Sequence, residues 1–431
     1  MAMTIKRWAR TAALALLMLL VAWVACNGPW ADDSPQPVPP ALRLSPPGVP
    51  PELNAFVGLQ GLLAPDGADL QAAGLAALRG DAAPSAGPRL RWPEGPLWQC
   101  QARRDDCVAR WRAQPEAARA LLADTQLLGA RCERLAQAQA WEELLPERQT
   151  EGPRAGVPFA ALPVPQFVDL TACVRRFGLK AVMAPSAAAA EAELVQADRL
   201  ARLALAGSRS LIGTMVTLSV VQSNWLLAAD LKAAGGLDRG GLMRLLTPLP
   251  AVALSPRAWA PHEARFAREV TRDLMDEARD CGAADALMGA SATGLLDRLV
   301  CTLRLGVLPE ATIQHNEAQW LARLATVPEA GPAACEVLEA EPWRERESRG
   351  FAWRNTVGRW LLDTSGAGWS PYAARQLDLE LLRLTLGAQL LGQSPPAGVS
   401  LTRESAGQRF AACRARLHPG DAEATLRLPL L

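Results

Sequence analysis

The feature that most constrains this chain is an apolar run near its N-terminus. Residues 11–26 read TAALALLMLLVAWVAC and carry no charged side chain. A helix that spans a membrane needs about 20 apolar residues, and roughly 17 is the lower limit. Trp8 and Trp30 are aromatic residues of the type that lies at membrane interfaces, and they extend the run to that length. We therefore predict a transmembrane signal anchor over residues 11–30.

The charges on either side of the run predict its orientation. Residues 1–10 hold three Lys or Arg side chains, whereas Asp32 and Asp33 follow the run. Positively charged flanks remain on the cytoplasmic side of a membrane. Residues 1–10 are therefore expected in the cytoplasm. The prediction is a single-pass protein of the bacterial inner membrane, with its body in the periplasm.

Cys26 leaves other interpretations of this segment open. A conventional cleavage site needs small residues three and one positions before the cut, and a cut after Ala25 would put Trp23 at the first of these positions. The stretch Trp23-Val24-Ala25-Cys26 resembles a bacterial lipobox, whose pattern prefers Leu where Trp23 stands. That resemblance implies a lipoprotein acylated at Cys26. Export as a cleaved, soluble protein is the third alternative.

A proline-rich segment separates the anchor from the rest of the chain. Residues 27–51 include nine prolines. Such segments favour the extended polyproline conformation, which rises about 3.1 Å per residue. We predict a linker over residues 31–51, and the whole proline-rich stretch 27–51 would hold the body up to roughly 75 Å from the membrane. The alternative is a polyproline ligand for a partner domain.

The remaining residues, 52–431, have the composition of a large folded body. The chain has 431 residues, of which 50% are hydrophobic and 21% are charged. Its 45 basic and 44 acidic side chains leave a net charge of +1, and nucleic-acid binding normally requires a strongly basic face. Apolar residues recur at helical spacing and rarely alternate. The sequence predicts a mainly α, all-helical extracytoplasmic body with little or no β structure and a possible sub-boundary near residues 235–255.

The apolar pattern also predicts individual elements. Gly207 is expected to divide the longest helical pattern, and residues 211–221 are too few for a second membrane span, which favours a central buried helix. The weakly alternating end, residues 424–431, predicts a short strand. The expected helices cover residues 53–63, 115–145, 186–232, 262–280, 293–305, 309–325, 350–363 and 375–392.

The cysteines fit an oxidising compartment. After Cys26 there are eight, and an even number is compatible with up to four disulfides. A continuous helix would place Cys100 and Cys107 about 10.5 Å apart, too far for a bond. Asp105 or Asp106 is, however, a good N-cap for a helix that begins near Cys107, so a loop-to-helix disulfide is possible. The eight candidates are Cys100, Cys107, Cys132, Cys173, Cys281, Cys301, Cys335 and Cys413.

Two carboxylates are candidates for catalysis. Glu317 falls near the apolar stripe of its helix, where an ion pair with an arginine such as Arg323 is the alternative. Glu404-Ser405 resembles the Glu-Ser pair of lytic transglycosylases, which implies cleavage of sugar chains by a carboxylic acid. The downstream motifs of those enzymes are missing. No CxxC pair, phosphate-binding loop or dinucleotide fingerprint occurs, so we expect no metal and no cofactor.

These observations predict a membrane-anchored periplasmic helical protein that acts as a binding or structural component of the envelope. Its expected partners are the membrane, through residues 11–30, and an envelope protein or cell-wall component, with no nucleic acid. The alternative is a carboxylate-dependent envelope hydrolase that acts on peptidoglycan through Glu317 or Glu404. The lack of a complete catalytic motif favours the non-enzymatic interpretation.

Overall fold

The computed structural model of the chain is mainly helical, which confirms the prediction from the apolar spacing. It describes residues 2–80, 87–144, 165–279, 308–326, 335–336, 353–355, 358–359, 362, 370–404, 407–413, 415 and 425–429. The main helices are α1 (Ala2–Asn27), α2 (Ala55–Gln60), α3 (Leu70–Arg79), α4 (Cys107–Arg112), α5 (Pro115–Asp124), α6 (Gln126–Gln137), α7 (Val168–Val182), α8 (Ala187–Gly207), α9 (Leu211–Ala233), α10 (Arg239–Leu245), α11 (Ala260–Arg279), α14 (Pro309–Ala325) and α17 (Ser370–Leu390).

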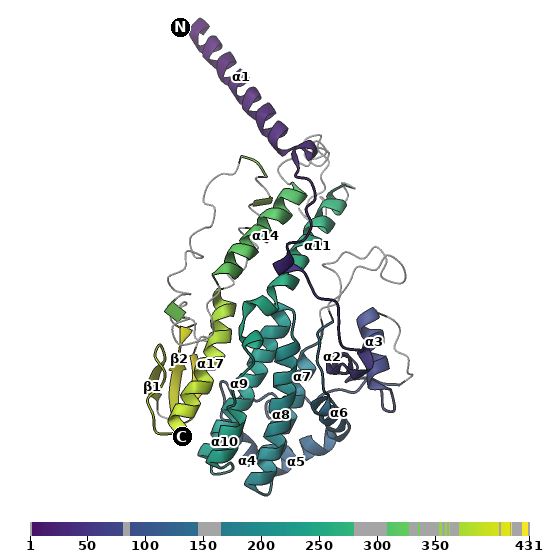
Figure 1. Ribbon diagram of the computed structural model, residues 1–431, viewed down its shortest axis with the longest axis vertical. Coiled ribbons are helices and arrows are strands. Elements are labelled where there is room, and N and C mark those ends of the chain that lie inside the picture. Colours follow the sequence, from purple (N-terminus) through teal and green to yellow (C-terminus); the bar gives the residue numbers. More distant parts are fainter. Residues whose placement is uncertain are drawn as a thin grey trace.

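Helix α9 lies at the centre of the body, as predicted for its most apolar part. It packs against α7, α8, α10 and α17 (Figure 1). Among the described helices it is the one long and apolar enough to cross a membrane, and the apolar stretch of α1, Thr11–Asn27, is shorter. However, 61% of the most apolar window of α9 is buried in the body. Trp225 on this helix is fully buried, as expected of a core helix.

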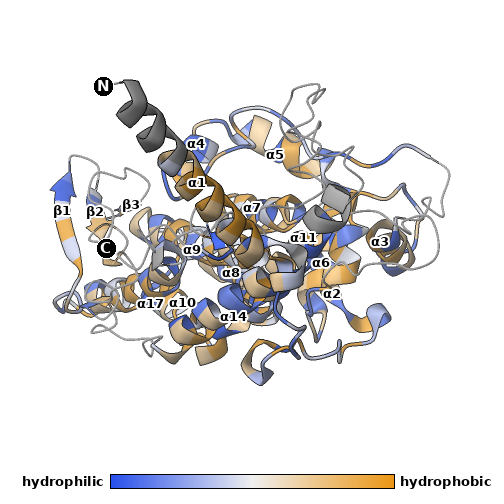
Figure 2. Ribbon diagram, turned by 90° about the horizontal axis from the view of Figure 1, so that it is seen from above, coloured by the Kyte–Doolittle hydropathy of each residue, from blue (hydrophilic) through white to orange (hydrophobic). Residues whose placement is uncertain are grey.

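Helix α1 stands apart from the body. It projects from one end of the molecule in Figure 1, and its hydrophobic colouring stands out in the view from above in Figure 2. Its large apolar side chains are 54–67% exposed, so the body does not cover them. These side chains are Leu14, Leu16, Leu17, Met18, Leu19, Leu20 and Val21.

The turn between α8 and α9 is held by a buried carboxylate. Gly207 ends α8, as predicted, and a Cβ atom there would lie 1.9 Å from the carbonyl oxygen of Trp141. Glu143, 1% exposed, accepts hydrogen bonds from the backbone amides of Arg209 (2.7 Å) and Ser210 (2.9 Å). Because the Ser210 hydroxyl in turn caps α9, Glu143 fixes where the central helix begins.

The proline-rich segment does not extend away from the body as the predicted spacer would. Leu42 is 1% exposed. The backbone amides of Gly48 and Val49 each donate a hydrogen bond of 2.8 Å to the carboxylate of Glu142. Polyproline backbone makes no hydrogen bonds with itself, so its free amides are available to groups on the body. The segment lies along the body and is part of it.

A small antiparallel sheet closes the C-terminal part of the body. Its strands, β1 (Ser400–Glu404), β2 (Gly407–Ala411) and β3 (Thr425–Leu428), lie in the order β1-β2-β3. Leu426 and Leu428 are buried and alternate with half-buried residues, which is the period of a strand with one covered face. The predicted strand at the chain end is therefore confirmed as β3. These few short strands agree with the expected little β structure, although the hairpin of β1 and β2 was not predicted.

Other elements differ from the predicted pattern. The segment expected as one helical run over residues 115–145 forms α5 and α6, with a break at Thr125, and α3 and α7 were not predicted. Residues 293–305 and most of residues 350–363 lie outside the described part. The core is continuous across residues 235–255.

Three disulfides are present among the described cysteines. The predicted pair Cys100–Cys107 is confirmed, with α4 beginning at Cys107 and Asp106 as its N-cap. Cys132–Cys173 joins α6 to α7, and Cys335–Cys413 joins residues on either side of α17. Cys26 is a free, partly exposed thiol. Cys281 and Cys301 lie outside the described residues.

Asp230 connects the central helix to the sheet. Its carboxylate pairs with the guanidinium of Arg427 on β3. Burial raises the pKa of Asp230 to about 6, and Arg427 offsets only part of this effect.

We predict that Asp230 makes the protein less stable as the pH rises from about 4 to about 6. In this window the folded protein retains the Asp230 proton and the unfolded chain has lost it, so stability falls as pH rises. The shift from 3.8 to about 6 corresponds to about 3 kcal/mol. Urea unfolding should show that Asp230→Asn removes a decrease in stability of this size, whereas Asp105→Asn, at a half-exposed ion pair, should not. Wild-type and Asp230→Asn curves with the same pH dependence would contradict this.

Candidate functional site

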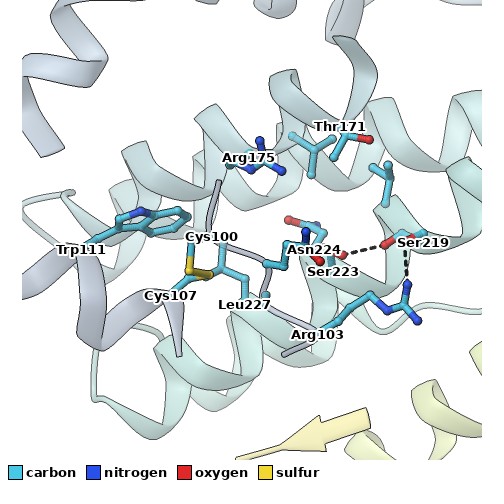
Figure 3. Close-up of a pocket in the computed structure, with 14 residues that line it drawn as sticks. Cys100, Arg103, Cys107, Trp111, Thr171, Arg175, Ser219, Ser223, Asn224 and Leu227 are labelled. Carbon is cyan, nitrogen blue, oxygen red and sulfur yellow. Dashed lines mark hydrogen bonds between the residues drawn. A yellow bond between two sulfur atoms is a disulfide. The ribbon is translucent and has the colours of Figure 1, made fainter. Parts of the chain in front are cut away.

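A cavity of about 230 Å³ lies between the loop before α4 and the facing sides of α7 and α9 (Figure 3). Three elements from distant parts of the sequence form its walls. The residues that line it are Cys100, Gln101, Ala102, Arg103, Cys107, Trp111, Thr171, Val174, Arg175, Ser219, Val220, Ser223, Asn224 and Leu227.

Helical periodicity brings these residues to one place. Thr171, Val174 and Arg175 are three and four positions apart on α7, so they share one face of the helix. The lining residues of α9 recur with the same spacing over residues 219–227. The loop wall is held by the Cys100–Cys107 disulfide and by the N-cap bond from the Ala109 amide to Asp106.

Arg175 is the main cationic group of the cavity. Its guanidinium lies over the ring of Trp98, 5.7 Å from the centroid, a cation–π arrangement. Trp98 is 3% exposed and stacks on Trp92 at 5.4 Å. Burial lowers the pKa of Arg175. Among the described residues no carboxylate pairs with Arg175, in contrast to Arg427 with Asp230.

Hydroxyl groups line the α9 side. The Nη1 atom of Arg103 donates a hydrogen bond to Ser219 Oγ (3.1 Å), and Ser223 Oγ donates to the Ser219 carbonyl (2.7 Å). Because Ser219 Oγ accepts from Arg103, its own hydrogen remains available to a ligand. Asn224 Nδ2 donates to the Leu194 carbonyl, 3.3 Å away.

The chemistry of these walls suits binding and lacks groups for proton transfer. Among the described residues that line the cavity, none is Asp, Glu or His, and both sulfurs are in a disulfide. A hydrolytic site needs an acid or base within hydrogen-bond reach of the reacting group. The cavity instead offers cationic and hydroxyl donors beside an apolar wall.

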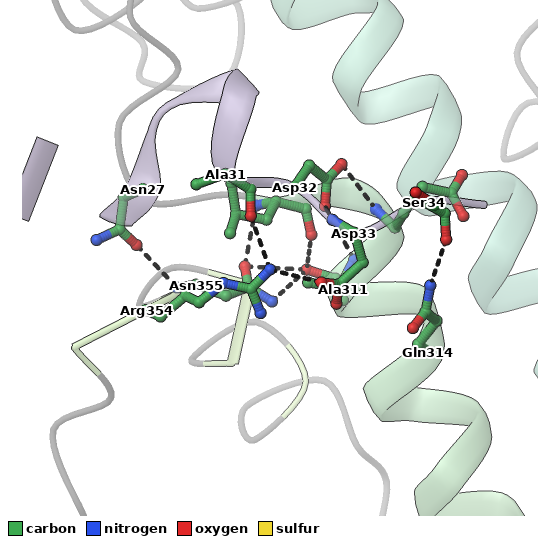
Figure 4. A network of polar contacts seen from close by, with 12 residues as sticks. Asn27, Ala31, Asp32, Asp33, Ser34, Ala311, Gln314, Arg354 and Asn355 are labelled. Atoms are coloured by element: carbon green, nitrogen blue, oxygen red, sulfur yellow. Dashed lines mark hydrogen bonds and ion pairs between the residues drawn. The ribbon is translucent and has the colours of Figure 1, made fainter. Parts of the chain in front are cut away.

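A second polar cluster, which we call the junction, joins the end of α1 to the body (Figure 4). Asn27, the last residue of α1, is fully buried. Its Nδ2 donates to the Trp353 carbonyl (2.8 Å), and its Oδ1 accepts from the Asn355 amide (2.8 Å). Asn355 has a positive φ of 56°, a conformation that asparagine tolerates better than most residues.

Asp32 extends the junction by capping α14. The backbone amides of Glu310 and Ala311 donate to its two carboxylate oxygens (3.1 and 3.0 Å). Helix α14 begins after Leu308, which has no side chain able to cap it. A carboxylate at a helix N-terminus accepts hydrogen bonds from the free amides and interacts favourably with the helix dipole. The segment after α1 therefore supplies a cap that α14 lacks.

Neither of the two predicted catalytic carboxylates lines the cavity, and they lie on different elements, α14 and β1. Glu317 on α14 is 4% exposed and accepts hydrogen bonds from Nε (2.8 Å) and Nη2 (2.5 Å) of Arg268 on α11. Glu317 therefore has an arginine partner, as the alternative interpretation expected, but the partner is Arg268 and not Arg323. Glu404 ends β1 on the surface and pairs with Arg409 (2.7 Å). Ser405 lies outside the described residues.

We predict that Glu317→Gln weakens the fold because it removes one partner of a buried ion pair. Leaving Arg268 without its counter-charge should cost about 3 kcal/mol. The surface variant Glu404→Gln is the matched control and should cost less than about 1 kcal/mol. Urea unfolding measures both. Full stability of Glu317→Gln, together with loss of a peptidoglycan-cleaving activity of the wild type, would instead assign Glu317 a catalytic role.

The cavity was not predicted from the sequence. Its residues come from three separate segments. Because α7 was not predicted as a helix, the spacing of Thr171 and Arg175 could not be recognised as one helix face. The adjacent Cys100 and Cys107 pair was the available signal, because it fixes one wall. No group of three or more metal-binding side chains occurs among the described residues. No protein-family model, curated protein or solved structure matches the chain.

Proposed function

We propose that this chain is a membrane-anchored envelope protein of bacteria whose helical body is a binding component and not an enzyme. In this proposal α1 spans the inner membrane and the body lies in the periplasm. The exposed apolar surface of α1 is the observation that carries the anchor, because these side chains are 54–67% exposed and nothing in the described body covers them. Burial in lipid would remove that surface from water.

The disulfides support the periplasmic location. Six of the described cysteines form three bonds, and such bonds persist mainly in oxidising compartments. The orientation follows from the positive residues that precede the apolar run. Acylation at Cys26 is the alternative mode of attachment, and it would also leave the body in the periplasm.

The cavity supports the binding role. It is pre-formed, lined by donors and apolar side chains, and held by a disulfide at one wall. The hydrolase alternative has less support, since Glu317 is occupied by Arg268 and Glu404 lies at the end of a surface strand. Neither carboxylate lines the cavity.

The junction indicates how the body is attached to the proposed anchor. A free proline-rich spacer would let the body move independently of α1. Here Asn27 and Asp32 tie the end of α1 and the following segment to α14 and residues 353–355. The proposal therefore includes a body held close to the membrane in a defined orientation.

The anchor and the location are tested with one preparation of full-length protein. We expect the protein in the membrane fraction, resistant to carbonate extraction and released by detergent. Before reduction, a membrane-impermeant maleimide should not label the six disulfide cysteines, and reduction should expose them. Intact mass then separates an uncleaved chain from one that begins at an acylated Cys26. A protein in the cytosolic fraction with all these thiols free would refute the proposal.

Substitutions at two neighbouring aspartates test whether the junction holds the body to the segment after α1. Asp32→Ala should lower stability by about 1 kcal/mol, the usual effect of losing a helix cap, and should speed hydrogen exchange at the amides of Glu310 and Ala311. Asp33→Ala is the control, because the amides at the start of α14 bond to Asp32 and Asp33 instead pairs with Arg354 at the surface, where such pairs contribute little. Equal effects of the two substitutions would show that the cap does not hold the segment.

A further inference from the structure

Buried cations in this protein are, as a rule, matched by acceptors. Arg268 is held by Glu317 and Arg427 by Asp230. Arg131, 1% exposed, donates to the carbonyls of Leu62, Ala64 and Pro65 at 2.7 Å each. A buried guanidinium without such partners is costly, which explains why these arrangements recur.

Arg175 is a half-buried cation without acceptors of this kind. Its described contact is the face of Trp98, and no described carboxylate or hydrogen-bond acceptor is paired with its guanidinium. The ring interaction stabilises a cation without using its N–H donors. Trp98 is fixed by stacking on Trp92, whose Nε1 donates to Asp169 (2.9 Å). Arg175 is thus pre-positioned at the wall of a cavity, and no described protein group occupies its N–H donors.

The rest of the cavity has matching chemistry. The Ser219 hydroxyl, which accepts from Arg103, can donate its hydrogen to a negatively charged oxygen. An apolar wall formed by Trp111, Val174 and Leu227 lies in the same cavity. At about 30 Å³ for each water molecule, the volume of about 230 Å³ equals roughly eight waters, the size of a small organic molecule.

We propose that this cavity binds a small organic carboxylate, with its carboxylate group against Arg175 and Ser219 and its apolar part against Trp111 and Leu227. The planar guanidinium matches a carboxylate with two parallel hydrogen bonds. The inference deepens the proposed binding role by naming the class of ligand. It does not depend on whether α1 spans the membrane.

The test is isothermal titration calorimetry of the full-length protein in detergent with three probes. Benzoate carries the carboxylate and an apolar ring, benzamide is its neutral isostere, and inorganic phosphate is an anion without an apolar part. We expect benzoate to bind at least about tenfold more tightly than benzamide, since charge-assisted bonds to Arg175 are lost in the amide. Equal affinity for the two, or binding of phosphate without benzoate, would overturn the proposal.

Variants assign the binding to this cavity. Arg175→Gln should weaken benzoate binding about tenfold or more, and Arg175→Lys should retain part of the affinity because it keeps the charge. Arg323→Gln is the matched control: Arg323 also lies over a tryptophan, 5.3 Å from the Trp320 centroid, and burial also lowers its pKa, but it does not line the cavity. Unchanged binding by Arg175→Gln would overturn the assignment.

Two further measurements distinguish misfolding of a variant, absence of the carboxylate site and absence of the anchor. Circular dichroism and thermal unfolding identify a variant that fails to fold, and Ser219→Ala then provides a second variant with a smaller change, for which binding should weaken by a few fold. Membrane fractionation of the same cells tests the anchor. A membrane-bound protein with no benzoate affinity would refute the carboxylate site alone, whereas a soluble protein that binds benzoate would refute the anchor alone.

Discussion

The arrangement of the body depends on two adjacent buried carboxylates, Glu142 and Glu143. Glu143 binds the amides at the start of α9, and Glu142 binds the amides of the proline-rich segment and the guanidinium of Arg209. Buried carboxylates are costly unless they accept several hydrogen bonds, and here each does so. Two neighbouring residues thus connect the segment after α1, the turn before the central helix and the surrounding core. The positions of α8 and α9 follow from this contact, and with them one wall of the cavity.

The helical body follows from local patterns that a sequence displays directly. The helix over residues 309–325, the division at Gly207 and the N-cap near Cys107 are confirmed because each depends on neighbouring residues: apolar spacing, a glycine and a capping aspartate. The last strand is likewise visible as a short alternation. In these places local preference and tertiary structure agree.

The features that sequence analysis missed are those in which distant residues meet. The proline-rich segment has the composition of a free spacer, and its docking depends on Glu142, about ninety residues further along the chain. The partner of Glu317 is Arg268, on another helix, and not Arg323 on the same one. The hairpin of β1 and β2 depends on pairing with β3 and on the burial of Phe410. The cavity combines three segments and no motif.

The position of Asn27 has a consequence for biogenesis. The residue directly follows Cys26, and its links to Trp353 and Asn355 lie on the C-terminal side of any cut made before that cysteine. Such a cut would remove the bond to the Trp23 carbonyl and leave those two intact. A lipid on Cys26 would then be attached one residue from the buried asparagine. Asn27 would contact the body in the same way whether a membrane helix or a lipid on Cys26 attached the chain. A change in processing would therefore alter the means of attachment without reorienting the body.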